Sequence, residues 1–133
     1  MINKDIIKLA SNTSNVGLKN KYSHKISLKN STCGDKITLE LTADKKKISS
    51  MKYETISCVY CEASASLLSR KIKNVKLKDI KNDLINLKKI SLKKNIKIPK
   101  RLSDFEKLLN SDNFNRFKCI FLPIDAVLKA LKL

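Results

Sequence analysis

The hydrophobic positions of the chain first follow a helical period and then a period of two. Ile2, Ile6, Leu9 and Ala10 recur at helical spacing and predict a short amphipathic helix. Three later runs alternate apolar and polar residues, as strands with one buried face do. These runs are Ile26 and Leu28, then Ile37, Leu39 and Leu41, and then the weaker run from Ile48 to Ile56. Turns rich in Asn, Ser, Gly and Asp support an antiparallel meander.

The helical period returns after Cys58. Three amphipathic helices are expected, with core positions at Ala63, Leu67, Leu68 and Ile72, then Leu77, Ile80, Leu84 and Leu87, and finally Ile124, Val127, Leu128 and Leu131. Pro99 disfavours a helix at Ile98, so the segment 93–101 is interpreted as a connection. Ser103 and Glu106 form a capping-box pattern that predicts a helix start. Pro123 is expected near the first turn of the last helix, where its missing N–H is tolerated.

This order of elements predicts an α+β fold. We expect a small three-stranded antiparallel sheet with an N-terminal helix and several C-terminal helices packed on one face. The length of 133 residues suits one compact domain, and no repeat or low-complexity linker divides it, so 1–133 is interpreted as a single domain. No apolar stretch has the length of a signal peptide or a membrane span. A cytoplasmic protein without a membrane partner is therefore expected.

The formal net charge of +17 would attract nucleic acid or another anionic surface. However, the lysines are spread over nearly every segment, and few aromatic residues stand among them for base stacking. Nucleotide composition alone can also produce such a bias. Nucleic acid is therefore not an expected partner, although a basic nucleic-acid-binding protein with a purely structural metal site stays open as an alternative.

Three of the four cysteines fall at the ends of predicted elements, where functional residues concentrate. Cys33 lies in the turn between the first two strands, Cys58 where the third strand gives way to a helix, and Cys119 just ahead of the last helix. In a reducing compartment, metal binding, catalysis or burial explains cysteines better than disulfides do. A helix N-terminus or a nearby cation favours the reactive thiolate, whereas a core position makes cysteine a small hydrophobe.

The spacing Cys58-x-x-Cys61 does not by itself define a site. A zinc ribbon requires a second pair of this kind, and a thioredoxin-like site requires a βαβ setting that the meander does not provide. His24, the only histidine, is interpreted as a surface residue and not as a ligand. No glycine-rich phosphate loop appears, and no Ser-His-Asp or Cys-His arrangement can be assembled around one histidine.

Four short motifs together resemble those of the U-type iron–sulfur assembly family, which includes the NifU N-terminal domain, IscU and the SufU-like branch. The segment 30–35, Asn-Ser-Thr-Cys-Gly-Asp, resembles the family's Asn-Pro-x-Cys-Gly-Asp turn. Cys58 followed by Ala-Ser-Ala-Ser at 63–66 resembles its helix start. Arg-Phe-Lys-Cys at 116–119 resembles its Arg-x-Lys-Cys motif, and Asn-Val-Gly at 15–17 resembles a motif after the first helix. The matches are in the family's order and span nearly the whole chain.

Two features resemble the SufU-like branch more closely: Lys118 stands where IscU proteins carry histidine, and the interval from Cys58 to Cys119 is long. The sequence also departs from the family pattern. Ser31 replaces the usual proline, Ser57 replaces a glycine, and Cys61 stands where relatives commonly have serine. These departures concern cluster stability and partner recognition more than the fold.

The resemblance implies a site formed by Cys33, Asp35, Cys58 and Cys119. Three thiolates and one carboxylate suit zinc, iron or a transient 2Fe-2S cluster, and the carboxylate is the ligand most easily displaced. Cys119 is the expected persulfide acceptor, because it precedes a helix and has basic neighbours. Cys61, one helical turn from Cys58, could replace Asp35 as a ligand, but burial in the core is the preferred interpretation.

The implied partners are a cysteine desulfurase, which delivers sulfur as a persulfide, and acceptor apo-proteins or carrier proteins. The implied function is that of a scaffold or sulfur acceptor in iron–sulfur cluster assembly, without independent catalytic turnover, so the protein is not expected to be an enzyme. A zinc-bound sulfurtransferase that accepts persulfide and never holds a cluster is the alternative within the family.

Overall fold

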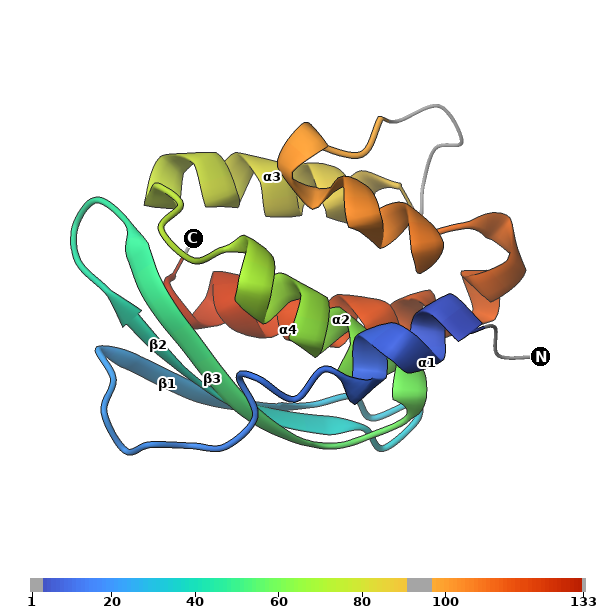
Figure 1. Cartoon of the computed structure of the whole chain (residues 1–133), viewed down its shortest axis with the longest axis horizontal. Coiled ribbons are helices and arrows are strands. Elements are labelled where there is room, and N and C mark those ends of the chain that lie inside the picture. Colours follow the sequence, from blue (N-terminus) through green and yellow to red (C-terminus); the bar gives the residue numbers. More distant parts are fainter. Residues whose placement is uncertain (1–3, 91–96, 133) are drawn as a thin grey trace.

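The computed structural model describes residues 4–90 and 97–132, which follow the predicted order of elements. These elements are α1 (Lys4–Ser11), β1 (His24–Lys29), β2 (Lys36–Ala43), β3 (Ile48–Ile56), α2 (Val59–Lys71), α3 (Leu77–Lys89), η1 (Lys100–Lys107), η2 (Ser111–Arg116) and α4 (Phe117–Ala130). The strands form an antiparallel sheet in the order β1-β2-β3, and the helices lie over one of its faces (Figure 1). The predicted α+β class is confirmed.

The core lies between the inner face of the sheet and the helices α2 and α4. On the central strand β2, Ile37, Leu39 and Leu41 have no solvent exposure, as their alternation predicts. Removing each such side chain from water contributes about 1.5–3 kcal/mol. A one-residue slip of β2 would turn this set toward solvent, so the alternation also fixes the register that carries the turn between β1 and β2 to its place.

The helix α2 is buried along most of its length because its first turns are built from small residues. Ala63 and Ala65 have no exposure, and α1 and α4 both pack against this helix. The buried serines between them are paired: Ser64 Oγ donates to the Ile120 carbonyl at 2.6 Å, and Ser66 Oγ donates to the Asn12 carbonyl at 2.8 Å. Paired hydroxyls avoid the cost of buried unsatisfied polar groups. Ser64 thus ties α2 to α4, and Ser66 ties α2 to the residue that follows α1.

The last helix begins earlier than predicted, so Cys119 lies inside it and not ahead of it. α4 starts at Phe117, whose ring contacts that of Phe114 with centroids 5.4 Å apart, and Cys119 is its third residue. Pro123 stands in the helix interior and not in its first turn. Proline has no N–H to donate to the carbonyl four residues before it, so the Cys119 carbonyl loses its usual helical partner.

The predicted capping box at Ser103 and Glu106 is wrong. The 3-10 helix η1 begins at Lys100, where Leu102 N donates to the Pro99 carbonyl at 2.9 Å, but its backbone is kinked at Leu102 (φ −109°, ψ 22°), so a second helical segment does begin near Ser103. Within the described part of the chain, the Ser103 side chain makes no hydrogen bond. Of the other predicted features, Ile2 and positions 93–96 of the connection lie outside the described residues.

Glu40 is a buried carboxylate on the outer face of β2. Its side chain is 1% exposed because the segment between α1 and β1 crosses over it. Its Oε1 accepts hydrogen bonds from Lys19 N at 2.8 Å and Asn20 N at 3.1 Å, and Lys25 Nζ lies 3.5 Å from its Oε2. Glu40 therefore anchors that segment to the sheet.

We expect Glu40→Ala to lower the free energy of unfolding by about 1–3 kcal/mol, because two backbone amides lose their acceptor. The matched control is Glu54→Ala. Glu54 is exposed and accepts from Leu18 N of the same segment at the longer distance of 3.5 Å, so its loss should cost less than about 0.5 kcal/mol. Urea unfolding measures both values. Equal values would show that Glu40 does not anchor the segment.

Among the described residues, every helix is too short or too polar to span a lipid bilayer.

Candidate metal-binding site

Three of the four predicted ligands converge at one end of the sheet. The ligand atoms of Cys33, Asp35 and Cys119 all lie within 4.8 Å of one another, and the Cys119 and Cys33 sulfurs are 3.5 Å apart. Cys33 and Asp35 come from the turn between β1 and β2, and Cys119 comes from the first turn of α4. Residues far apart in the sequence thus form a group of the size that a metal ion needs.

The turn that carries Cys33 and Asp35 is closed by its own backbone. Asn30 N donates to the Asp35 carbonyl at 2.8 Å, and Gly34 N donates to the Asn30 carbonyl at 2.7 Å. The Asn30 side chain also accepts from Thr32 N at 2.9 Å. Gly34 has φ of 77°, a conformation that a side chain would strain. Glycine is therefore required between the two candidate ligands.

Cys58, the fourth predicted ligand, lies beside this group and contacts Asp35. It is the N-cap residue of α2, and its own side chain does not cap the helix. Instead, Asp35 Oδ1 accepts from Cys58 N at 3.2 Å, and Asp35 Oδ2 accepts from the Cys58 thiol at 3.3 Å. A carboxylate at the N-terminus of a helix is favoured by the helix dipole. Asp35 therefore joins the turn to the start of α2.

The thiols of the site differ in exposure. Cys33 is exposed, whereas Cys119 is 3% exposed and Asp35 is 6% exposed. Burial raises the pKa of the Cys119 thiol above its ordinary range, and the hydrogen bond with Cys33 and the nearby Cys58 raise it further. Without a cation in the site, Cys119 is a protonated thiol. A metal ion would have to displace this proton to bind the sulfur.

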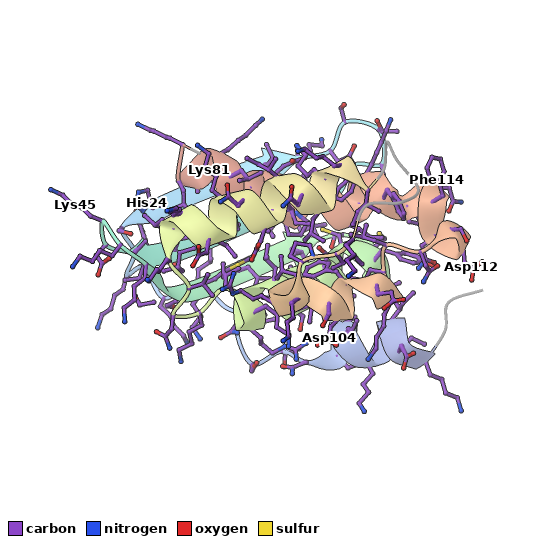
Figure 2. All side chains as sticks on the ribbon, turned by 90° about the horizontal axis from the view of Figure 1, so that it is seen from above. His24, Lys45, Lys81, Asp104, Asp112 and Phe114 are labelled. Atoms are coloured by element: carbon purple, nitrogen blue, oxygen red, sulfur yellow. The ribbon has the colours of Figure 1, made fainter. Side chains whose placement is uncertain are left out.

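Cys61 and His24 lie outside the converging group. Cys61 has no solvent exposure, and burial raises its pKa to about 12, so the predicted core position is confirmed. His24 begins β1, whereas Cys33 follows the end of that strand. Six residues of extended chain span about 17 Å. Figure 2 places His24 near the end of the molecule opposite Phe114, and Phe114 lies just before the helix that carries Cys119.

A hollow of about 350 Å³ adjoins the site, and the sequence analysis did not identify it. The turn residues Ser31 and Thr32 line one side, and Lys118, Leu122 and Lys129 of α4 line the other. These α4 residues stand at i, i+4 and i+11, which places them on one helix face. The sequence spacing could therefore have shown that these residues share a helix face. That this face lies against the turn between β1 and β2 is visible only in the folded structure.

The fold and the convergent thiols and carboxylate define a small α+β domain with a candidate metal site. A family model described as the NifU-like N-terminal domain matches residues 1–115. The chain belongs to this family. The matched region contains Cys33, Asp35 and Cys58 and ends just before Cys119.

The chain is also similar to known proteins. The chain is 31% identical over 105 residues to the iron–sulfur cluster assembly scaffold protein IscU of Thermotoga maritima, with 78% of this chain and 73% of that protein covered. A NifU-like N-terminal protein from Brucella abortus superposes with a TM-score of 0.87 at 21% identity, covering 98% of this chain and 91% of that one. A protein from Fervidobacterium islandicum, assigned as an assembly scaffold for the SUF system, gives 0.86 at 20% identity, with 98% and 96% covered. The two structures share the fold.

Proposed function

We propose that this protein is a scaffold for iron–sulfur cluster assembly and not an enzyme with its own turnover. The observation that carries the proposal is the convergence of Cys33, Asp35 and Cys119, with Cys58 against Asp35, in a member of the NifU-like family. The relative from Thermotoga maritima that bears the name of such a scaffold supports it.

The proposed ligands are Cys33, Asp35, Cys58 and Cys119, and their present contacts suggest how they would take up iron or a nascent 2Fe-2S cluster. The Cys58 thiol now donates to Asp35 Oδ2. Loss of the Cys58 proton removes this hydrogen bond and frees a thiolate and a carboxylate oxygen together. A carboxylate is a harder ligand than a thiolate and holds these metals less firmly. Asp35 would therefore be the first ligand to leave when the cluster moves to an acceptor protein or carrier.

We further propose a cysteine desulfurase as the sulfur donor and Cys119 as the residue that finally accepts the sulfur. Of the neighbouring cysteines Cys33 and Cys119, Cys33 is exposed and open to a bulky donor, whereas Cys119 is buried. The Cys119 sulfur lies 3.5 Å from the Cys33 sulfur, so once Cys119 has lost its proton it could attack the outer sulfur of a persulfide on Cys33 and release the Cys33 thiolate. The hollow lined by Lys118 would accept an anionic part of the donor. The SufU-like branch is our proposal for the subgroup, because Lys118 stands where IscU proteins carry histidine and the interval from Cys58 to Cys119 is long.

The second candidate function is a zinc-bound sulfurtransferase that never holds a cluster. Three cysteines and one aspartate also match the four-coordinate shell that zinc prefers. Both candidates use the same residues, so the bound metal and the fate of the sulfur separate them.

Anaerobic incubation with ferrous iron, a cysteine desulfurase and cysteine distinguishes the two. We expect charge-transfer bands from thiolate-bound iron in visible absorption, together with acid-labile sulfide that stays with the protein. The matched control is the Cys33→Ser protein, which should develop neither signal. A protein that binds zinc and takes up persulfide, but develops no iron bands, would instead be the sulfurtransferase.

A further inference from the structure

Cys61 is a nucleophile that the proposed function does not use. Cys58 is the N-cap of α2 and Cys61 is the third residue of that helix. Glu62 N donates to the Cys58 carbonyl at 3.1 Å, which closes the first turn around both cysteines. Residues three apart on a helix are neighbours, with Cβ atoms about 5–6 Å apart. Local backbone structure thus places the two cysteines about one helical turn apart, and the Cys58 thiol at present donates to Asp35 Oδ2.

This spacing is close to that of a disulfide, whose Cβ atoms lie about 3.5–4.5 Å apart. Closing the bond requires the two residues to approach by about 1–2 Å, the difference between these ranges. Cys58 can move in this way because it lies outside the helical backbone, with φ of −74° and ψ of 167°. An N-cap residue can rotate without breaking the helix that follows it.

The two cysteines are also unequal in the way that redox-active pairs are. Cys58 is partly exposed and stands at the N-terminus of α2, where a reagent from solution can reach it. Cys61 is completely buried and has a raised pKa. The Cys58 thiol can therefore form an adduct with a reagent from solution, while the Cys61 thiol is shielded from that reagent. The strand-to-helix junction supplies this arrangement without a thioredoxin fold.

We propose that Cys58 and Cys61 form a redox-active dithiol in which Cys61 resolves sulfur adducts carried on Cys58. In the first step, the Cys58 thiolate attacks a low-molecular-weight disulfide, forms a mixed disulfide and expels one thiolate. In the second step, Cys61 gives up its proton and attacks the Cys58 sulfur. The Cys58–Cys61 disulfide forms and the second small thiol leaves. The two cysteines lose two electrons and two protons, and the small disulfide gains them.

If the adduct on Cys58 is a persulfide, the leaving group is hydrosulfide. The bond between Cys58 and the outer sulfur breaks, the Cys58–Cys61 bond forms, and the outer sulfur leaves reduced to the level of sulfide. The dithiol itself supplies both electrons, so no other reductant enters this step. Sulfide is the form of sulfur that a cluster contains. This use rests on the proposed function, whereas the dithiol chemistry rests on the geometry alone.

A trapping experiment with oxidised glutathione tests the dithiol. The reduced, metal-free full chain is treated with the disulfide, quenched with an alkylating reagent and mapped by mass spectrometry. In the unaltered protein we expect a peptide pair linked through Cys58 and Cys61. In Cys61→Ala and in Cys61→Ser, the glutathione adduct on Cys58 should accumulate at least about tenfold more, because no neighbouring thiol displaces it. Circular dichroism checks that both variants fold.

Equal adduct on Cys58 in all three proteins would overturn the proposal. So would a map in which Cys58 is linked to Cys119, or in which only Cys33 and Cys119 are linked, because another thiol would then do the resolving or the dithiol would not react. Incubation with a small persulfide tests the second use: the unaltered protein should release several-fold more hydrosulfide than Cys61→Ala. If the iron incubation gave no charge-transfer bands but the glutathione trapping gave the Cys58–Cys61 disulfide, the scaffold function would be refuted and the dithiol proposal would hold.

Discussion

Replacing Cys33, Cys58 or Cys119 singly with serine should weaken iron or zinc binding at least about 100-fold, since even the loss of a residue that only supports a ligand costs 10–100-fold. A serine hydroxyl stays protonated at neutral pH and is a poor substitute for a thiolate. The structure supports this expectation for all three residues: Cys33 and Cys119 bring their sulfurs to 3.5 Å, and Cys58 contacts Asp35. Competition with a chromophoric chelator measures the affinity.

Cys61→Ala is the matched variant for this series. It removes a thiol from the same helix turn as Cys58, but Cys61 lies outside the group of Cys33, Asp35 and Cys119. We expect a change in metal affinity of less than about tenfold, below the loss of even a supporting residue. A loss equal to that of Cys58→Ser would make Cys61 a ligand and overturn the assignment of Asp35 as the fourth one.

Ile48→Ala should lower the free energy of unfolding by about 2–5 kcal/mol, a large share of the 5–15 kcal/mol that holds most domains folded. Ile48 begins β3 and has no solvent exposure. Its backbone also pairs with Val75 and Asn74, so the strand is held in place and cannot collapse fully around the cavity. Thermal unfolding followed by circular dichroism measures the loss.

Ile56→Ala supplies the comparison, because it makes the same change at the other end of the same strand. Ile56 is 78% exposed, and its truncation should cost less than about 0.5 kcal/mol. Similar losses at both positions would show that the inner face of the sheet is not the main core. Because Ile56 stands two residues before Cys58, this variant also reports whether an exposed apolar side chain near the site affects metal binding.

The strands were predictable because their signal is local. Ile37, Leu39 and Leu41 alternate with polar residues, and burial of one sheet face requires that pattern. Glu40 shows the limit of this argument: its position predicts an outward polar residue, but only the path of a distant segment makes it buried. The sequence prediction placed the start of α4 too late, because proline is common in the first turn of a helix and Pro123 was assigned there. In the structure the helix begins at Phe117, whose ring contacts Phe114.

The candidate site was identified from the order of its motifs and not from spacing alone. Nothing local to Cys33 or Cys119 indicates that their sulfurs meet, and the resemblance supplied that expectation. The structure brings Cys33, Asp35 and Cys119 together and adds the Asp35 contact to Cys58, which no sequence pattern predicted. The exposure of Cys33 and the burial of Cys119 also depend on packing between distant elements. The identity of the metal stays a proposal, because three thiolates and one carboxylate suit both zinc and iron.

The meeting of Cys33 with Cys119, 86 positions apart in the chain, has a thermodynamic consequence. An ion held by both sulfurs is a cross-link that the unfolded chain cannot keep, so each tenfold excess of free metal over its dissociation constant adds about 1.4 kcal/mol to folding stability. A loaded protein would resist proteolysis and an emptied one would open more readily. The amount of bound metal would thus help to determine the lifetime of the protein against degradation.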